Sequence, residues 1–102
     1  MEDILSKLFT TALDIPQMLT ALQQAVPDIV WEAHESYHEG DYVLGRTENQ
    51  TKLRIVEWGK VYEAEVYFPR GKIRDAQKKQ LMNRLTGEIL PAIKAENIED
   101  LD

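Results

Sequence analysis

The chain has 102 residues, with 18 acidic and 12 basic side chains, a net charge of −6 and no cysteine. This length fits one domain, and an apolar content of 43% is enough for a small hydrophobic core. The absence of cysteine excludes disulfide-stabilised scaffolds, iron–sulfur proteins, thiolate zinc modules and cysteine enzymes.

The N-terminal region predicts two helices. In the first, apolar side chains recur at spacings of three and four, and these residues are Ile4, Leu5, Leu8, Phe9, Ala12 and Leu13. A second, shorter helix is expected to begin at Pro16, because proline is favoured at the first helical position. Pro27 and Asp28 are expected to end it.

Between Asp28 and Phe68 the hydrophobic pattern changes to a period of two, which is typical of β-strands. Turn signals divide this region at residues 39–41, 48–50 and 59–60. We therefore expect a four-stranded antiparallel meander. In its last strand, Glu63 and Glu65 are expected to face outward, and the residues expected to face the core are Tyr62, Ala64, Val66 and Phe68.

The C-terminal region predicts one long helix, with an apolar stripe from Ile73 to Ile93. Gly87 and Pro91 are expected to kink or divide it. The acidic residues 96–102 are expected to fray. The predicted fold is a single α+β domain: two N-terminal helices, a four-stranded antiparallel sheet and a long C-terminal helix, with the helices packed on one face of the sheet.

One short motif carries a specific chemical meaning. Residues 34–38 read His-Glu-Ser-Tyr-His, an H-E-x-x-H pattern that resembles the signature of the zincin metallopeptidases. The resemblance implies zinc held by His34 and His38, with Glu35 as the general base for a metal-bound water. A third ligand would be required, and the candidates are Glu57, Glu63 and Glu65.

The zinc site depends on the conformation of residues 28–39. A helix, with Asp28 as its N-cap and Gly40 as its stop, would place both histidines on one face. A strand would separate them by about 13 Å, at roughly 3.3 Å per residue, which is too far to share one zinc ion. We expect a strand with two solvated histidines and no cofactor, and zinc is the alternative.

The net charge conceals three blocks of opposite sign. Residues 1–45 hold eight acids and one base (net −7), residues 46–84 hold ten bases and five acids (net +5), and residues 85–102 hold five acids and one base (net −4). Basic residues near the start of the last helix could bind phosphate or another anion, and these are Arg70, Lys72, Arg74 and Lys78. The competing interpretation is a solvated helix face, with Asp75 and Lys79 supporting each other.

No serine-hydrolase elbow or glycine-rich nucleotide loop is present in the sequence. We therefore expect a non-enzymatic module that binds a protein partner, or a second copy of itself, through the open face or an edge of its sheet. The predicted contact residues are Glu32, His34, Ser36, His38, Glu63 and Glu65. The alternatives are a zinc-dependent hydrolase and an anion-binding site at residues 70–79.

Neither a membrane nor nucleic acid is an expected partner. No apolar run approaches the roughly 20 residues that span a bilayer, and the acidic N-terminus lacks the pattern of a signal peptide. A cytoplasmic location is therefore expected. Glu63 and Glu65 would repel a phosphate backbone. Trp31 and Trp58 are expected in or beside the core, and either would mark a partner surface if it were exposed.

Overall fold

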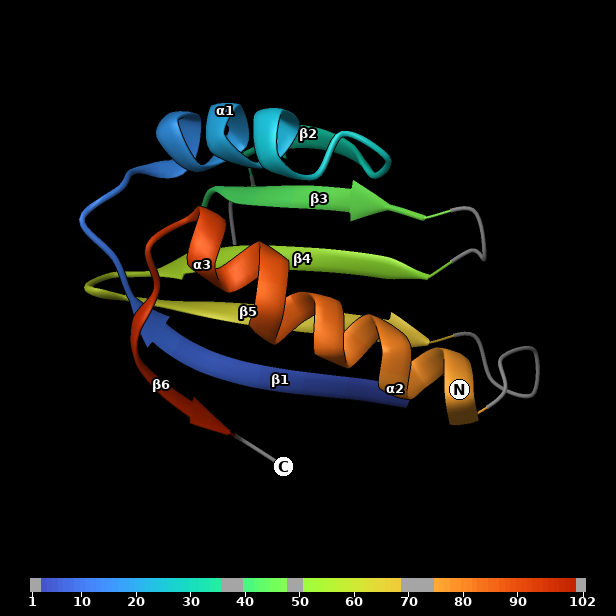
Figure 1. The fold of residues 1–102 in the computed structure, drawn as a ribbon. Coiled ribbons are helices and arrows are strands. Elements are labelled where there is room, and N and C mark those ends of the chain that lie inside the picture. The colour runs from blue at the N-terminus through green and yellow to red at the C-terminus, as the bar shows by residue number, and fades with distance from the viewer. Residues whose placement is uncertain (1–2, 36–39, 48–50, 69–74, 101–102) are drawn as a thin grey trace.

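In the computed structural model, the described residues form a six-stranded antiparallel sheet with helices over one face (Figure 1). The structure describes residues 3–35, 40–47, 51–68 and 75–100. The elements are β1 (Asp3–Thr10), α1 (Ile15–Ala25), β2 (Val30–His34), β3 (Tyr42–Arg46), β4 (Lys52–Trp58), β5 (Val61–Phe68), α2 (Asp75–Arg84), a π-helical turn (Leu85–Ile89), α3 (Leu90–Ala92) and β6 (Glu96–Asp100). The strand order is β2-β3-β4-β5-β1-β6.

The first predicted helix is wrong, because residues 3–10 form the strand β1. An apolar run of this kind fits either a helix face or a strand with apolar neighbours on both sides. Leu5, Lys7 and Phe9 lie opposite core-facing residues of β5, and Phe9 is fully buried. Pairing of β1 with β5 and β6, both distant in sequence, overrides the local helical periodicity.

The second predicted helix is present as α1. The Asp14 side chain accepts the backbone N–H of Gln17 at 2.9 Å, and the Gln17 side chain accepts the backbone N–H of Asp14 at 3.0 Å. This capping box satisfies two amide groups that a helix start leaves without partners. Pro16 lies in the first turn, and Met18 and Leu22 are buried. The helix connects β1 to the far edge strand β2.

The predicted meander is present as β2 to β5, but the four-stranded sheet is wrong because β1 and β6 extend it beyond β5. The hairpin of β4 and β5 turns at Gly59, whose φ of +67° favours glycine. The other two predicted turns include residues outside the described part of the chain. The predicted inner side of β5 is confirmed, since the buried residues are Tyr62, Ala64, Val66 and Phe68.

The C-terminal helix is interrupted where the sequence predicts. Residues 85–89 form a π-helical turn, in which Leu90 donates its N–H to the carbonyl of Leu85, five residues earlier. Pro91 has no N–H, and its ring would clash with the carbonyl of Gly87 in a regular α-helix. A local π-helical register accommodates the proline without ending the helical segment.

The expected frayed tail is also wrong, because Glu96–Asp100 forms β6 and pairs antiparallel with β1. The Lys7 ammonium contacts the Asp100 carboxylate directly across the two strands. Asn97 Nδ2 donates to Thr10 Oγ1 at 3.0 Å. These contacts attach an acidic segment, all of whose residues are exposed, to the edge of the sheet.

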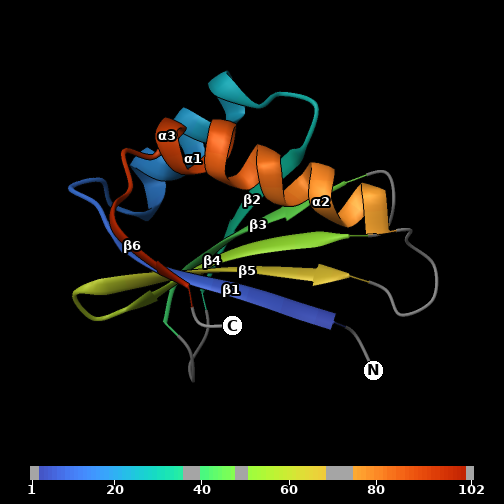
Figure 2. The same ribbon diagram turned by 60° about the horizontal axis from the view of Figure 1, so that its bottom comes forward.

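The helices all lie over the same face of the sheet, and no described helix covers the opposite face (Figure 2). The single core between sheet and helices includes the aromatic side chains Phe9, Trp31, Tyr62 and Phe68. Helix α1 supplies Met18 to it, and the π-helical turn supplies Leu85 and Ile89. Burial on one side only leaves the second sheet surface, called the open face below, to solvent.

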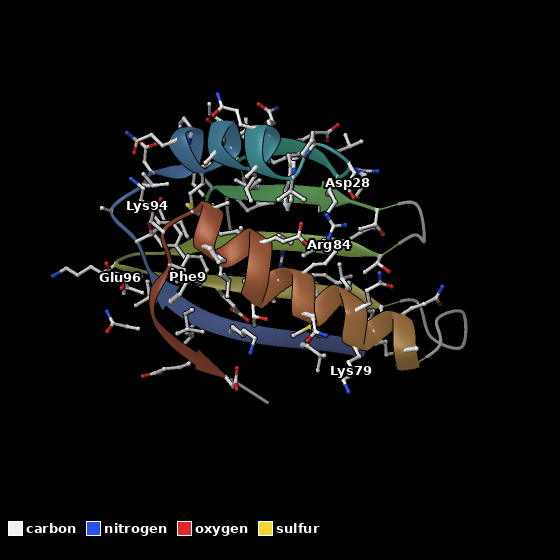
Figure 3. All side chains as sticks on the ribbon, in the orientation of Figure 1. Phe9, Asp28, Lys79, Arg84, Lys94 and Glu96 are labelled. Atoms are coloured by element: carbon white, nitrogen blue, oxygen red, sulfur yellow. The ribbon has the colours of Figure 1, made fainter. Side chains whose placement is uncertain are left out.

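An ion-pair cluster joins α2 to the connection between α1 and β2 (Figure 3). The two terminal nitrogens of Arg84 donate to the two carboxylate oxygens of Asp28, each at 2.8 Å, and its Nε donates to Glu88 at 2.9 Å. The hydrogen bond from Arg84 lowers the pKa of Asp28. The hydrogen bonds to Asp28 and Glu88 raise the pKa of Arg84. The cluster holds the C-terminal helical segment against the N-terminal half of the chain.

Candidate functional site: the open face of the sheet

The strand register assigns the side chains of the open face to rows, because directly opposed residues of antiparallel strands point to the same side. The first row contains Val30, Arg46, Lys52 and Tyr67. The second row contains Glu32, Leu44, Arg54, Glu65 and Ser6. The third row contains His34, Tyr42, Val56, Glu63, Leu8 and Glu99.

The structure places four of the predicted contact residues together on this face, and these are Glu32, His34, Glu63 and Glu65. The other two, Ser36 and His38, lie outside the described residues. Three residues of the predicted anion site also lie outside them, namely Arg70, Lys72 and Arg74. The fourth, Lys78, holds its ammonium 5.7 Å from the centroid of the buried Phe68 ring.

The zinc alternative requires a helix over residues 28–39, but residues 30–34 form the strand β2. His34 is the last residue of β2, and Glu35 follows the strand as an exposed residue. The His34 Nε2 atom lies 3.1 Å from Glu32 Oε2, and the imidazole stacks on the Tyr42 ring with centroids 5.4 Å apart. His34 therefore belongs to the side-chain surface of the sheet rather than to a helical ligand pair.

The centre of the open face is a network around Arg54. Its guanidinium lies over two aromatic rings, 5.4 Å from the Tyr42 centroid and 5.6 Å from the Tyr67 centroid. Arg54 Nε and a terminal nitrogen approach Glu65 Oε1 at 3.0 and 2.8 Å. The Tyr67 hydroxyl donates to Glu65 Oε2 at 2.8 Å. With side-chain exposures of 20% for Arg54 and 12% for Glu65, this network is a shielded, ordered platform.

Sequence reasoning missed this network, although it placed Glu65 on the correct face. Alternation along β5 is enough to place Tyr67 on the same face as Glu65, because the two residues are two positions apart. Arg54 and Tyr42 belong to other strands, and only the register brings them beside Glu65.

Exposed apolar side chains gather on the same face. Among the described residues, the large apolar side chains with high exposure are Val30 at 61%, Ile98 at 47%, Trp58 at 42% and Val61 at 37%. The register places Val30, Trp58 and Val61 on the open face. Trp58 Nε1 donates to Glu63 Oε1 at 3.0 Å, so the indole is held in place. Trp31, in contrast, is buried beneath the helices, as expected.

A shallow hollow of about 290 Å³ opens on this face beside the Arg54 network. Its lining residues are Tyr42, Leu44, Lys52, Arg54 and Tyr67. Tyrosine, arginine and leucine side chains in a concave surface offer apolar contact together with hydrogen-bond donors. Such a surface can seat a protruding side chain of a partner.

In comparisons with known proteins, no protein-family model matches the sequence, and no curated protein matches it. Within the described residues, none of the helices is long and apolar enough to cross a bilayer.

Proposed function

We propose that this chain is a non-enzymatic cytoplasmic binding module that takes a protein partner on its open face. The observation that carries the proposal is the grouping of exposed apolar side chains around the Arg54 network on one surface. Protein interfaces are enriched in tyrosine, tryptophan and arginine, and hot-spot residues of these types tend to cluster near the centre of the contact. Val30, Trp58 and Val61 supply the exposed apolar area.

The order within this surface also supports the proposal. Arg54 and Tyr67 are fixed through Glu65, and Trp58 is fixed through Glu63. Side chains that are already ordered lose little conformational entropy when a partner binds. The open face can therefore bind with a low ordering cost, as expected of a preformed docking surface.

The two alternatives have less support. The zinc-dependent hydrolase requires a helix where β2 is a strand. The anion site at residues 70–79 depends mainly on residues outside the described part of the chain, and Lys78 contacts the Phe68 ring. The binding module is the function we carry forward.

Site-specific photo-crosslinking tests the proposed function. A crosslinking amino acid replaces Leu44 on the open face or, as a matched control, the exposed Gln80 on α2. In cells that produce the protein, we expect a crosslinked protein with the probe at position 44 and none with the probe at position 80. The captured partner is identified by mass spectrometry and then purified. The Leu44→Lys substitution is expected to raise the Kd of its complex with this protein at least about tenfold.

Two results would contradict the proposed function. One is the absence of any crosslinked protein from position 44. The other is capture of the same proteins with equal yield from positions 44 and 80, since this would indicate contact without a preferred surface.

A further inference from the structure

Two pairs of ionic side chains on the open face lack an ion-pair partner and lie diagonally across its centre; they are called the basic corner and the acidic corner below. Glu32 contacts His34, which is charged only if protonated. Arg46 and Lys52 face each other across β3 and β4 in the first row. Glu63 and Glu99 lie on either side of Leu8 in the third row, on β5 and β6. Within the described residues, no ion pair joins any of these four side chains to an opposite charge.

The basic corner is electrostatically unfavourable in the isolated chain. Like charges that face each other directly across two strands destabilise the pairing, and this applies to Arg46 and Lys52. Glu65 does not supply a carboxylate to Arg46 and Lys52, because it already pairs with Arg54. A docked surface that brings carboxylates to the basic corner would replace repulsion by attraction.

We propose that the open face binds a second copy of this chain, face to face, so that the basic corner of each copy (Arg46 and Lys52) meets the acidic corner of the other (Glu63 and Glu99). This inference rests on the proposed function and specifies its partner. The same face supplies both complementary charges, so a single twofold axis satisfies both corners at once.

The positions of the corners define the docking geometry. A twofold axis that lies in the interface and exchanges two diagonal corners must run along the other diagonal. With rows and strands forming a roughly square face, the strands of the two sheets then cross at about 90°, one of the two favoured arrangements for stacked sheets. The Arg54 network lies near the middle of this arrangement, and its charges are already paired within each copy.

The size of the face sets the expected affinity. Six strands spaced by about 4.8 Å, with about seven residues of roughly 3.3 Å each, give a face of roughly 24 by 23 Å. Two such faces correspond to the small end of specific interfaces, so we expect a dimer with a Kd in the micromolar range. The net charge of −6 on each copy opposes this only weakly at 0.15 M salt, where the Debye length is about 8 Å.

Sedimentation equilibrium of the purified full chain tests the inference with paired charge reversals. The basic-corner variant is Arg46→Glu with Lys52→Glu, and the acidic-corner variant is Glu63→Lys with Glu99→Lys. We expect wild type to dimerise and each variant alone to raise the dimer Kd at least about tenfold. An equimolar mixture of the two variants is expected to recover wild-type affinity within about threefold, because both corners then again meet opposite charges.

The matched control is Lys79→Glu with Lys94→Glu, which changes the same number of charges at exposed positions away from the open face (Figure 3). Its dimer Kd is expected to equal that of wild type. Circular dichroism checks that each variant is folded. If a double variant does not fold, the single changes Lys52→Glu and Glu63→Lys provide the same separate and mixed measurements.

A monomeric wild type up to about 500 µM, far above the expected Kd, would overturn the inference. A dimer that is insensitive to both corner variants, or a mixture that fails to recover, would also overturn it. The proposed function fails separately. A crosslink from position 44 to a different protein supports a binding module while ruling out the second copy as its partner, and a crosslink to another copy of the chain supports both.

Discussion

At the scale of single residues, Gly45 on β3 shows how closely the backbone and the core are fitted. A Cβ atom at this position would lie 2.5 Å from Cζ3 of Trp31, well inside van der Waals contact. The Trp31 ring cannot simply move away, because it is buried and its Nε1 donates to the Val26 carbonyl at 3.0 Å. The missing side chain of Gly45 is therefore what gives the indole its place on the helical side of the sheet.

We expect Gly45→Ala to lower the free energy of unfolding by about 2 kcal/mol, because an extra methyl group in a packed core displaces its neighbours. Urea denaturation followed by tryptophan fluorescence measures the change. The control is Gly87→Ala in the π-helical turn, where an added Cβ meets nothing within 4 Å. Alanine there is expected to raise stability by about 0.5 kcal/mol. Equal losses in both variants would contradict the role of Gly45.

At the scale of elements, the junction of α2 with the connection between α1 and β2 depends on charge. Arg84 extends from the end of α2 to Asp28 and also contacts Glu88 one turn further along. The hydrogen bond from Arg84 lowers the pKa of Asp28 below its ordinary value of 3.8. The stabilisation from this pair is therefore complete above that value and is lost as the pH falls through the lowered pKa.

We expect Arg84→Met, which keeps an unbranched stem, to lower the free energy of unfolding by at most about 1 kcal/mol at pH 7, since Asp28 is largely exposed. The difference from wild type should shrink as the pH falls through the lowered pKa of Asp28, below its ordinary value of 3.8. Urea denaturation at a series of pH values checks this. Lys79→Met in the same helix is the control. A similar pH-dependent loss of stability in that variant would contradict the stabilising role of the Arg84–Asp28 ion pair.

At the scale of the whole molecule, the charges of the open face link association to stability. If only folded chains form the dimer, their apparent stability rises with protein concentration. We expect the Tm of wild type to increase with protein concentration at about 0.15 M salt, and this increase to weaken at about 1 M salt, where the Debye length is about 3 Å. Differential scanning calorimetry at several concentrations measures it. A concentration dependence equally strong in the basic-corner variant would indicate a different interface.

The candidate site was predictable only in part, for a reason that individual residues make clear. Glu63 and Glu65 could be assigned to the outer side of β5 because alternation along one strand depends on chain neighbours. Tyr42 and Arg54 could not be placed beside them, because their position depends on how β3 and β4 are aligned with β5. A shift of one residue in register would move every side chain of a strand to the other face.

The sequence by itself determined the features that depend on neighbouring residues: the capped start of α1, the turn at Gly59, the inner side of β5 and the interruption near Pro91. Only the tertiary structure decided that residues 3–10 form a strand and that the acidic residues 96–100 join the sheet. Both segments have ambiguous or unfavourable local signals. Their conformation follows from pairing with distant segments, including the contact between Lys7 and Asp100, and such pairing energies cannot be read from local periodicity.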